Sequence, residues 1–447
     1  MNRSHPAGCP RLVRARRRAA ALVAMTAIGG AALAQSVESG QRLATFDAAW
    51  RLVRDTHFDP TFNGVDWNQV RNDLRPRAAA ASTDDALRGV IRNMLARLGQ
   101  SHFVLLPSTA VDTRDAGVVD ATFDAGVDVR LLDGRVLVSA VRHGGPAATA
   151  GVRSGWSLEG VDGFRIAPLV ARLPASLDPR VAGLEAWRAV TRRLRGPPGS
   201  ATRLEFEDGD GAHRSLEIRR VPEPGESVTV GSLPAFIVRF SRGWQTTPAG
   251  ARVGLIRFNV WMALVDAQVG EAIDLFRRAD GIVVDLRGNP GGLAAMLMGI
   301  SGYFLDEPLV LGTMTTRETD LRFVANPRRV NAAGDRVTPF SGPVAILVDG
   351  LTGSASECFA GGMQALGRAR VFGERSMGQA LPALFDRLPN GDVLIHAYGD
   401  FVTADGRRLE GRGVVPDEVV PLTRSDLLAG VDRPLAASLA WIDRTRR

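Results

Sequence analysis

The sequence predicts an α/β protein built from several domains. Two changes of pattern along the chain lead to this prediction. Between residues 40 and 110, apolar side chains recur at three- and four-residue spacing, as in helices, whereas short β-like runs with Gly and Asp turns follow up to about residue 222. From about residue 250, near-continuous apolar strands alternate with helices. With 447 residues and 45% apolar content, the chain is long enough for more than one hydrophobic core.

The first 34 residues have the pattern of a secretory signal peptide. The basic run "RLVRARRR" precedes an apolar stretch, and the small side chains of "ALAQ" suit cleavage after Ala34. An uncleaved membrane anchor is the alternative, but the apolar stretch is short for a span and is interrupted by glycine. We therefore expect a mature chain that begins near Gln35, is periplasmic or secreted, and has no stable membrane span.

Charge and cysteine content narrow the possible partners. The formal net charge is +7, but residues 1–34 contain six arginines and no acid. The rest of the chain is therefore nearly neutral and gives no indication of a nucleic-acid partner. Cys9 lies in the signal, so the mature chain keeps Cys358 alone and can form no internal disulfide. The histidines and acids lack metal-ligand spacing and no phosphate-binding loop is present, so we expect no metal and no cofactor.

Helices are expected in a first segment, residues 35–112. Thr83 suits the start of one of these helices, and Gly99 suits its end. Ser101 and His102 come directly after this helix, so the segment carries an adjacent Ser-His pair.

A second segment, residues 113–222, is rich in short strands and turns. It contains the loop "DAGVDV", the short helix "PAATAGVRSG" and the stretch "LRGPPGS", and with these motifs it resembles a PDZ domain. PDZ domains bind the C-terminus of a peptide as an added strand, and backbone N–H groups hold its carboxylate. The resemblance implies that Gly126 and Val127 supply this loop. Trp156 and Ser157 stand where such domains usually have an acidic residue, and a β domain that only spaces its neighbours is the alternative.

The third segment, residues 223–447, contains two glycine-rich turns that each join a strand to a helix. One turn, "DLRGNPGG", includes Gly291 and Gly292, and the other leads to Ser354 in "GSASE". The spacing Ser-x-x-Glu fits a capping box, so Ser354 could serve only to start a helix. It could also be a nucleophile, because the N–H groups of Ala355 and of Gly291 or Gly292 could stabilise an oxyanion there.

Four motifs in this order resemble the core of the carboxyl-terminal processing (tail-specific) serine peptidases: "DLRGNPGG", "GSASE", "GRARVFGERSMGQA" and "GRRLEGRGVVPD". The resemblance covers most of residues 40–420. It implies a mixed α/β core of the ClpP/crotonase type, with Ser354 as the nucleophile. Tail-specific members place a lysine downstream, where this chain has Gln379. Because the sequence contains no lysine at all, a Ser–Lys dyad is excluded.

The tricorn-like branch of this family uses a histidine instead. By resemblance to that branch, "LGQSH" supplies His102 as the general base and Ser101 as its neighbour, and "LEGRGVVPD" supplies Glu410. An imidazole can accept the proton of Ser354, and an acid or hydroxyl network can fix its tautomer. We expect activity to report an apparent pKa near neutrality for His102.

Other residues could take these roles. His396, on the strand "VLIHAYG", is the competing base, and we favour His102 because its neighbours match the pattern. Glu374 and Asp400 are alternatives to Glu410, and Ser356 is the fallback nucleophile.

The sequence therefore predicts an exported serine endopeptidase that cleaves proteins or peptides, selected through their C-termini. Two alternatives stay open. One is a catalytically inactive protein of the same fold that binds peptides or small ligands, which the departure at Gln379 supports. The other is a crotonase-like enzyme acting on acyl thioesters, although export would separate it from cytosolic acyl-CoA.

Overall fold

The computed structural model describes residues 40–108, 123–230 and 235–445, together with Met1. The predicted cleavage site at Ala34, and all of the predicted signal peptide except Met1, lie outside the described residues. Within these ranges, none of the helices combines the length and apolar character needed to cross a membrane.

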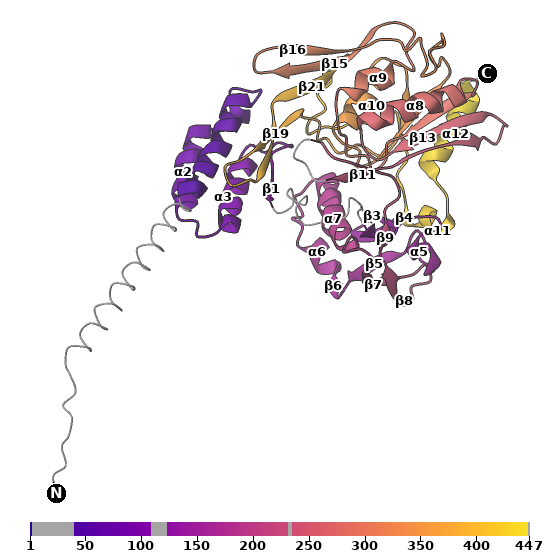
Figure 1. Cartoon of the computed structure of the whole chain (residues 1–447). Helices are drawn as coiled ribbons and strands as arrows, with labels where there is room; N and C mark the ends of the chain where they lie inside the picture. Colours follow the sequence, from indigo (N-terminus) through magenta and orange to yellow (C-terminus); the bar gives the residue numbers. More distant parts are fainter. Residues whose placement is uncertain (2–39, 109–122, 231–234, 446–447) are drawn as a thin grey trace.

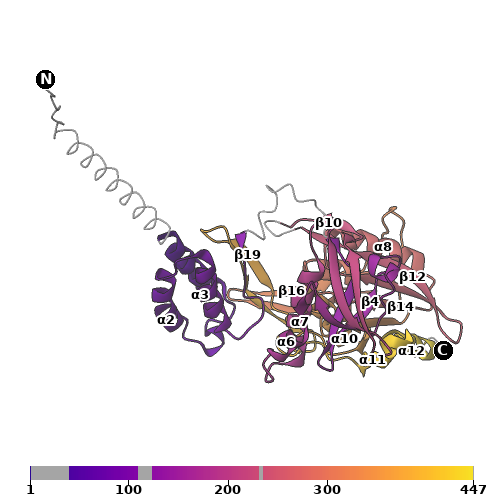
Figure 2. The same ribbon diagram turned by 90° about the horizontal axis from the view of Figure 1, so that it is seen from below.

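Helices form the N-terminal part of the described chain, as the apolar spacing predicted. Thr83 caps one of them, because its Oγ1 accepts the N–H of Ala86 at 3.1 Å. The helices bury Trp50 and Trp67 against one another and lie to one side of the molecule (Figures 1 and 2). The elements are the helix at residues 40–56, the 3-10 turn η1 (Phe62–Gly64), α2 (Trp67–Ala79) and α3 (Asp84–Ala96).

A three-stranded antiparallel sheet joins these helices to the rest of the chain. Its order is β1 (Val104–Leu106), β20 (Val393–Ala397) and β19 (Ala383–Arg387). Leu105 and Leu394 are buried with the side chains of the helices. Because β1 begins two residues after His102, its pairing with β20 places the Ser-His pair close to the C-terminal part of the chain.

The middle segment, residues 123–222, forms a second sheet below the core in Figure 1. The strands follow the order β3 (Val127–Leu132), β4 (Arg135–Val141), β5 (Ser157–Val161), β7 (Ala201–Glu207) and β8 (His213–Arg219), with β6 (Phe164–Arg165) beside β5. Short strands β2 (Phe123–Asp124) and β9 (Val221–Pro222) pair with each other. The helices are α5 (Pro146–Thr149), α6 (Ala167–Ala171) and α7 (Pro179–Leu194).

Helix α7 was not predicted from the sequence. Its start carries clear signals, because Asp178 accepts the N–H of Arg180 and Pro179 occupies the first helical position. Its buried side chains follow helical spacing from Leu184 to Leu194.

The C-terminal part of the chain contains a six-stranded sheet in which every neighbouring pair is parallel except β12 and β13. Its order is β12 (Phe240–Thr246), β13 (Arg252–Phe258), β14 (Gly281–Asp285), β17 (Val344–Val348), β18 (Arg370–Gly373) and β22 (Glu418–Val419). Since β14 and β17 are parallel neighbours, the turns that follow them leave the sheet side by side at the same edge. One of these turns carries Gly291 and Gly292, and the other carries Ser354.

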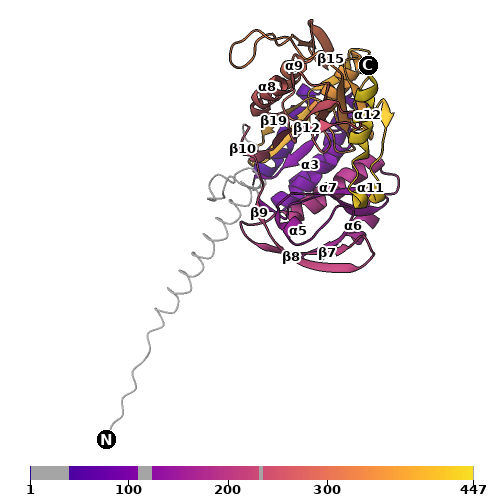
Figure 3. The ribbon, with the colours of Figure 1, turned by 90° about the vertical axis from the view of Figure 1, so that its right-hand side faces the viewer.

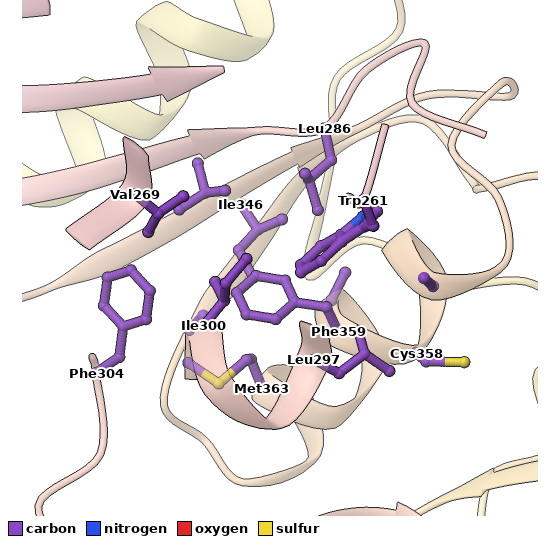
Figure 4. Packing of buried hydrophobic residues seen from close by; sticks show 14 of the residues in the cluster. Trp261, Val269, Leu286, Leu297, Ile300, Phe304, Ile346, Cys358, Phe359 and Met363 are labelled. Atoms are coloured by element: carbon purple, nitrogen blue, oxygen red, sulfur yellow. The ribbon is translucent and has the colours of Figure 1, made fainter. Parts of the chain in front are cut away.

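Helices cover both faces of this sheet, which Figure 3 shows between α8 and α12. On one face, α8 (Ala263–Phe276), α9 (Met296–Ser301) and α10 (Ala355–Ala365) form the main core. Figure 4 shows Ile346 of β17 packed with Phe359 of α10. The next residue, Leu347, points to the other face and packs with Ile442 of α12 (Arg433–Thr445). The strands are therefore buried on both sides, as near-continuous apolar runs predict.

Smaller elements complete the chain. They are the pair β10 (Glu226–Val228) and β11 (Phe236–Val238), the sheet of β16 (Asp320–Ala325), β15 (Leu309–Thr316) and β21 (Gly399–Thr403), and helix α11 (Arg424–Ala429). A loop around Glu410 runs between β21 and β22, and Gly411 and Gly413 in it both have φ of 71°. The expected mixed α/β architecture with N-terminal helices is confirmed.

Candidate active site

Ser354 stands at the sharp turn between β17 and α10, with φ of 52° and ψ of −121°. A positive φ is uncommon for a residue other than glycine and marks a backbone that its surroundings hold in place. The Ser354 N–H donates both to the carbonyl oxygen of Gln379 at 2.8 Å and to Oε2 of Glu357 at 3.0 Å. Within the described residues, the Ser354 hydroxyl makes no hydrogen bond to another side chain, that of His102 included.

The buried carboxylate of Glu357 organises the segment that faces Ser354. Its Oε1 accepts the Ser376 hydroxyl at 2.5 Å and the Gly378 N–H at 2.6 Å, and its Oε2 accepts the Gln379 N–H at 3.0 Å. The Ser354 N–H is its fourth donor. Burial raises the pKa of Glu357 to about 7, while these four donors act in the opposite direction. Glu357 thus accepts the Ser354 N–H, as the expected capping box requires, and the same carboxylate also fixes residues 376–379.

Ser101, His102 and Glu410 lie in one hydrogen-bonded chain. The Ser101 hydroxyl donates to Glu410 Oε2 at 2.9 Å and lies 2.8 Å from His102 Nδ1. An ionised Glu410 can only accept, so the single proton of the Ser101 hydroxyl then points to Glu410. The Ser101 oxygen in turn accepts a hydrogen bond from Nδ1–H of His102. Nε2 of a neutral His102 then keeps its lone pair and can act as a base.

The backbone at Gln379 and Ala380 joins this chain to the candidate nucleophile. The Ala380 N–H donates to Glu410 Oε2 at 2.9 Å, and the preceding carbonyl, that of Gln379, accepts the Ser354 N–H at 2.8 Å. A single peptide unit therefore has the Ser354 backbone on one side and the Glu410 carboxylate on the other. Gln379 takes part here through its main chain, whichever side chain it carries.

The ionisation of His102 differs from the expectation of a pKa near neutrality. Burial and the nearby charge of Arg188 lower the pKa of His102 to about 4. Burial also raises the pKa of Glu410, against its hydrogen bonds from Ser101 and Ala380. His102 is therefore neutral, and competent as a base, over a wider pH range than an unperturbed histidine.

Two backbone N–H groups beside Ser354 are open. The Gly291 N–H donates to the side-chain oxygen of Asn289 at 3.0 Å. By contrast, in the part of the chain that the structure describes, the N–H groups of Gly292 and Ala355 donate to no protein acceptor. A Cβ on Gly291 would lie 2.6 Å from Cβ of Ser354, which shows how closely the two turns approach. An oxyanion placed here could receive the Gly292 and Ala355 N–H groups.

The alternative residues lie elsewhere or are already bonded. His396 is fully buried between Thr56 Oγ1 at 2.9 Å and Asp386 Oδ2 at 2.8 Å. Ser356 is also fully buried, and its Oγ accepts the indole N–H of Trp261 at 2.8 Å.

The acids considered beside Glu410 face other groups. Glu374 accepts the N–H of Leu422 at 2.8 Å, and Asp400 pairs with Arg408 at 2.5 Å. Among the described residues, no group of three or more His, Cys, Asp or Glu side chains could hold a metal ion.

The loop at Gly126 and Val127 was expected to bind the carboxylate of a peptide, and its first N–H group is already bonded. The Gly126 N–H donates to Oδ1 of Asp124 at 3.0 Å, and the same oxygen accepts from Arg142 Nη2 at 2.5 Å. The Gly126 N–H is therefore occupied by a carboxylate of the chain itself. These residues and Val127 line a cavity of about 670 Å³ between the middle segment and the core.

Comparisons with known proteins show which families the chain resembles. The family model "Peptidase family S41" matches residues 252–420, and "Tricorn protease C1 domain" matches residues 41–96. Over residues 252–420, the chain therefore contains a domain that matches peptidase family S41. It is a serine peptidase and thus a hydrolase, and neither matching model describes an enzyme of acyl thioesters.

Similarity to known proteases extends over most of this chain. A "Carboxyl-terminal-processing protease" of Picosynechococcus sp. is 27% identical over 381 residues, which cover 83% of this chain and 82% of the relative. "Carboxyl-terminal-processing peptidase 3, chloroplastic" of Arabidopsis thaliana is 25% identical, with coverage of 86% and 69%. The solved structure of a "photosystem II D1 C-terminal processing protease" shares the fold, with a TM-score of 0.58, 24% identity, and coverage of 89% and 98%.

Proposed function

We propose that this S41 peptidase is an exported endopeptidase in which Ser354 is the nucleophile and His102 the general base. The observation that carries the proposal is the hydrogen-bonded chain from Glu410 through the Ser101 hydroxyl to Nδ1 of His102. Because Ser101 donates to Glu410, His102 carries its proton on Nδ1 and offers Nε2 as the base. Histidine thus takes the place of the lysine that the chain lacks.

In the proposed reaction, His102 acts in turn as base and as acid. His102 Nε2 takes the proton of the Ser354 hydroxyl as Oγ attacks a peptide carbonyl carbon, and the resulting oxyanion accepts the N–H groups of Gly292 and Ala355. His102 then gives the proton to the leaving amine, which releases the first product and leaves an acyl-serine. Water deprotonated by His102 hydrolyses this ester and restores Ser354. Ser101 and Glu410 keep the imidazole in the required tautomer.

Substrate selection is assigned to the middle segment, acting as a PDZ-like domain that binds peptide C-termini. The strand β3 next to the loop at Gly126 and Val127 supports this assignment, as do the names of the carboxyl-terminal-processing relatives. Since Asp124 occupies the Gly126 N–H, an incoming carboxylate would have to replace Asp124 beside Arg142.

Three alanine variants test the catalytic assignment. Ser354→Ala and His102→Ala should both lose hydrolysis of a quenched fluorescent peptide, on the order of a millionfold, because members of one catalytic unit fail together. Gln379→Ala should keep most of the activity, since Gln379 acts through its backbone. A fluorophosphonate should label the wild type at Ser354. Absence of labelling would instead favour a ligand-binding protein without activity. Loss of activity in His396→Ala but not in His102→Ala would reject His102 as the base.

Export is tested separately. The basic, apolar and small-residue pattern before Gln35 is its support. N-terminal sequencing of protein recovered outside the cytoplasm should begin near Gln35, and a start at Met1 would contradict it.

A further inference from the structure

Helix α7 of the middle segment touches the loops that form the candidate active site. On one face of the helix, Leu184 and Trp187 pack with Leu351, which precedes Ser354, and with Met377. Arg180 lies one turn before Leu184, on the same face. Its side chain is 15% exposed, and its guanidinium points at the main chain of two catalytic loops.

All five N–H groups of the Arg180 guanidinium have an acceptor. Two of them are held by Asp178, with Nε donating to Oδ1 at 3.0 Å and Nη2 to Oδ2 at 2.8 Å. The other three reach backbone carbonyl oxygens: Nη1 donates to Ser376 and to Arg412, both at 3.0 Å, and Nη2 to Gly411 at 3.2 Å. Arginine has five such donors, so none is left over.

The three carbonyl groups belong to the two segments on which the candidate site depends. Ser376 begins the stretch that Glu357 holds, and this stretch ends at Gln379, the acceptor of the Ser354 N–H. Gly411 directly follows Glu410. Arg180 therefore ties the segment behind Ser354 to the loop that presents the carboxylate of Glu410.

Two glycines lie beside the guanidinium. Gly378 and Gly413 have φ of 73° and 71°, a conformation that other residues rarely adopt. A Cβ on Gly378 would lie 3.0 Å from Nη1 of Arg180, and one on Gly413 would lie 2.6 Å from the Ser376 carbonyl oxygen and 3.1 Å from Nη1. The two loops and the guanidinium are therefore closely packed together.

We propose that Arg180 is a positioning residue of the S41 peptidase, which holds the segments of Gln379 and Glu410 in register for catalysis. The proposal rests on the proposed function of Ser354, His102 and Glu410. It makes helix α7 part of the catalytic structure, in addition to any part it has in binding peptides. Arg188, two turns further along α7, adds to this by lowering the pKa of His102.

Lysine cannot replace arginine at this position. An ammonium group has three donors on one nitrogen, whereas the acceptors here surround a planar fork. Arg180→Lys keeps the charge but must lose at least two hydrogen bonds, so it separates the geometry of the contact from its charge.

The test compares Arg180→Lys and Arg180→Ala with Arg192→Ala, an exposed arginine on the same helix. For each, kcat and KM are measured with a short peptide amide, and kcat is expressed per Ser354 titrated with a fluorophosphonate. Both Arg180 variants should lose about 10- to 100-fold in kcat, since displacement of a catalytic group by about 1 Å can cost 10²-fold. KM should change little, and Arg192→Ala should equal the wild type.

The possible outcomes are distinct. If Arg180 served only stability, the melting temperature and the titratable fraction would fall while kcat per titrated serine stayed at the wild-type value, and the proposal would be overturned. Wild-type kcat in Arg180→Lys would overturn it as well. If Ser354→Ala kept its activity, the proposed function would fail first, whatever the Arg180 variants did.

Discussion

The hydroxyl of Ser101 donates a hydrogen bond to Oε2 of Glu410 at 2.9 Å, across 309 positions of the chain. This contact joins the N-terminal helical part to a loop near the C-terminus. It also decides which nitrogen of His102 carries the proton, because the Ser101 oxygen must then accept from Nδ1–H. The base is therefore assembled from both ends of the sequence.

Glu410→Gln should lower activity by about 10²- to 10⁴-fold without removing it completely. An amide nitrogen in the place of Oε2 would donate to the Ser101 oxygen. The Ser101 hydroxyl would then donate to Nδ1 of His102. The neutral imidazole would carry its proton on Nε2, which could no longer act as the base. In steady-state kinetics, the activities of Glu410→Gln and Ser101→Ala should both lie between those of the wild type and His102→Ala. Activity of Glu410→Gln equal to the wild type would exclude the tautomer argument.

The pH dependence follows from the lowered pKa of His102. The log of kcat/KM should rise with pH through about 4, where His102 loses its proton, and stay level through neutrality. Removing the charge in Arg188→Ala should shift the rise to higher pH, because a nearby cation no longer opposes the imidazolium. The matched variant Arg192→Ala should keep the wild-type profile. A rise near pH 6.5 in the wild type would show that His102 is exposed to solvent during catalysis.

The candidate nucleophile and base could be predicted because each stands in a short contiguous motif. "GSASE" contains Ser354 and "LGQSH" contains His102, and the order of such motifs is visible in the sequence. The choice between Gly291 and Gly292 could not be predicted. It depends on the side chain of Asn289, which turns back and occupies the Gly291 N–H.

Arg180 could not be found from the sequence for a different reason. Its acceptors are backbone carbonyl groups, which every residue supplies, so nothing at Ser376, Gly411 or Arg412 marks them as partners. The occupied N–H of Gly126 escaped prediction in the same way, because a turn formed by Asp124 is only one of several conformations open to that loop.

Glu357→Gln tests the carboxylate behind Ser354. The four groups that face Glu357 are all donors, and an amide nitrogen would meet two of them without offering an acceptor. We expect a loss of about 1–3 kcal/mol in the free energy of unfolding, measured in urea, because a buried donor is left unpaired. Glu271→Gln is the control, since Glu271 is 59% exposed and pairs with Arg242 at the surface, where the loss should be within about 0.5 kcal/mol.

The pH dependence of stability gives a second check on Glu357. Its pKa is raised from 4.5 to about 7 in the folded chain, so the folded state binds more protons than the unfolded state between these values. This group therefore makes the wild type less stable as pH rises from 4.5 to about 7. Glu357→Gln should lose that part of the slope. An unchanged slope would show that Glu357 stays ionised, held by its four donors.

Selection of a peptide C-terminus is best tested on Ser354→Ala, which binds substrates without cleaving them. If the loop at Gly126 takes up a carboxylate beside Arg142, a labelled peptide with a free C-terminus should bind more tightly than its amide in fluorescence anisotropy. Asp124→Asn should tighten binding of the free acid. The substitution removes the carboxylate that competes with the peptide for Arg142, and a neutral amide oxygen holds the Gly126 N–H less strongly. Arg142→Ala should abolish the difference between acid and amide. Arg153→Ala, on the same segment but outside this loop, should preserve it. Equal binding of acid and amide by the Ser354→Ala protein would mean that the middle segment does not read C-termini, and Ser354 would then receive its substrates by another route.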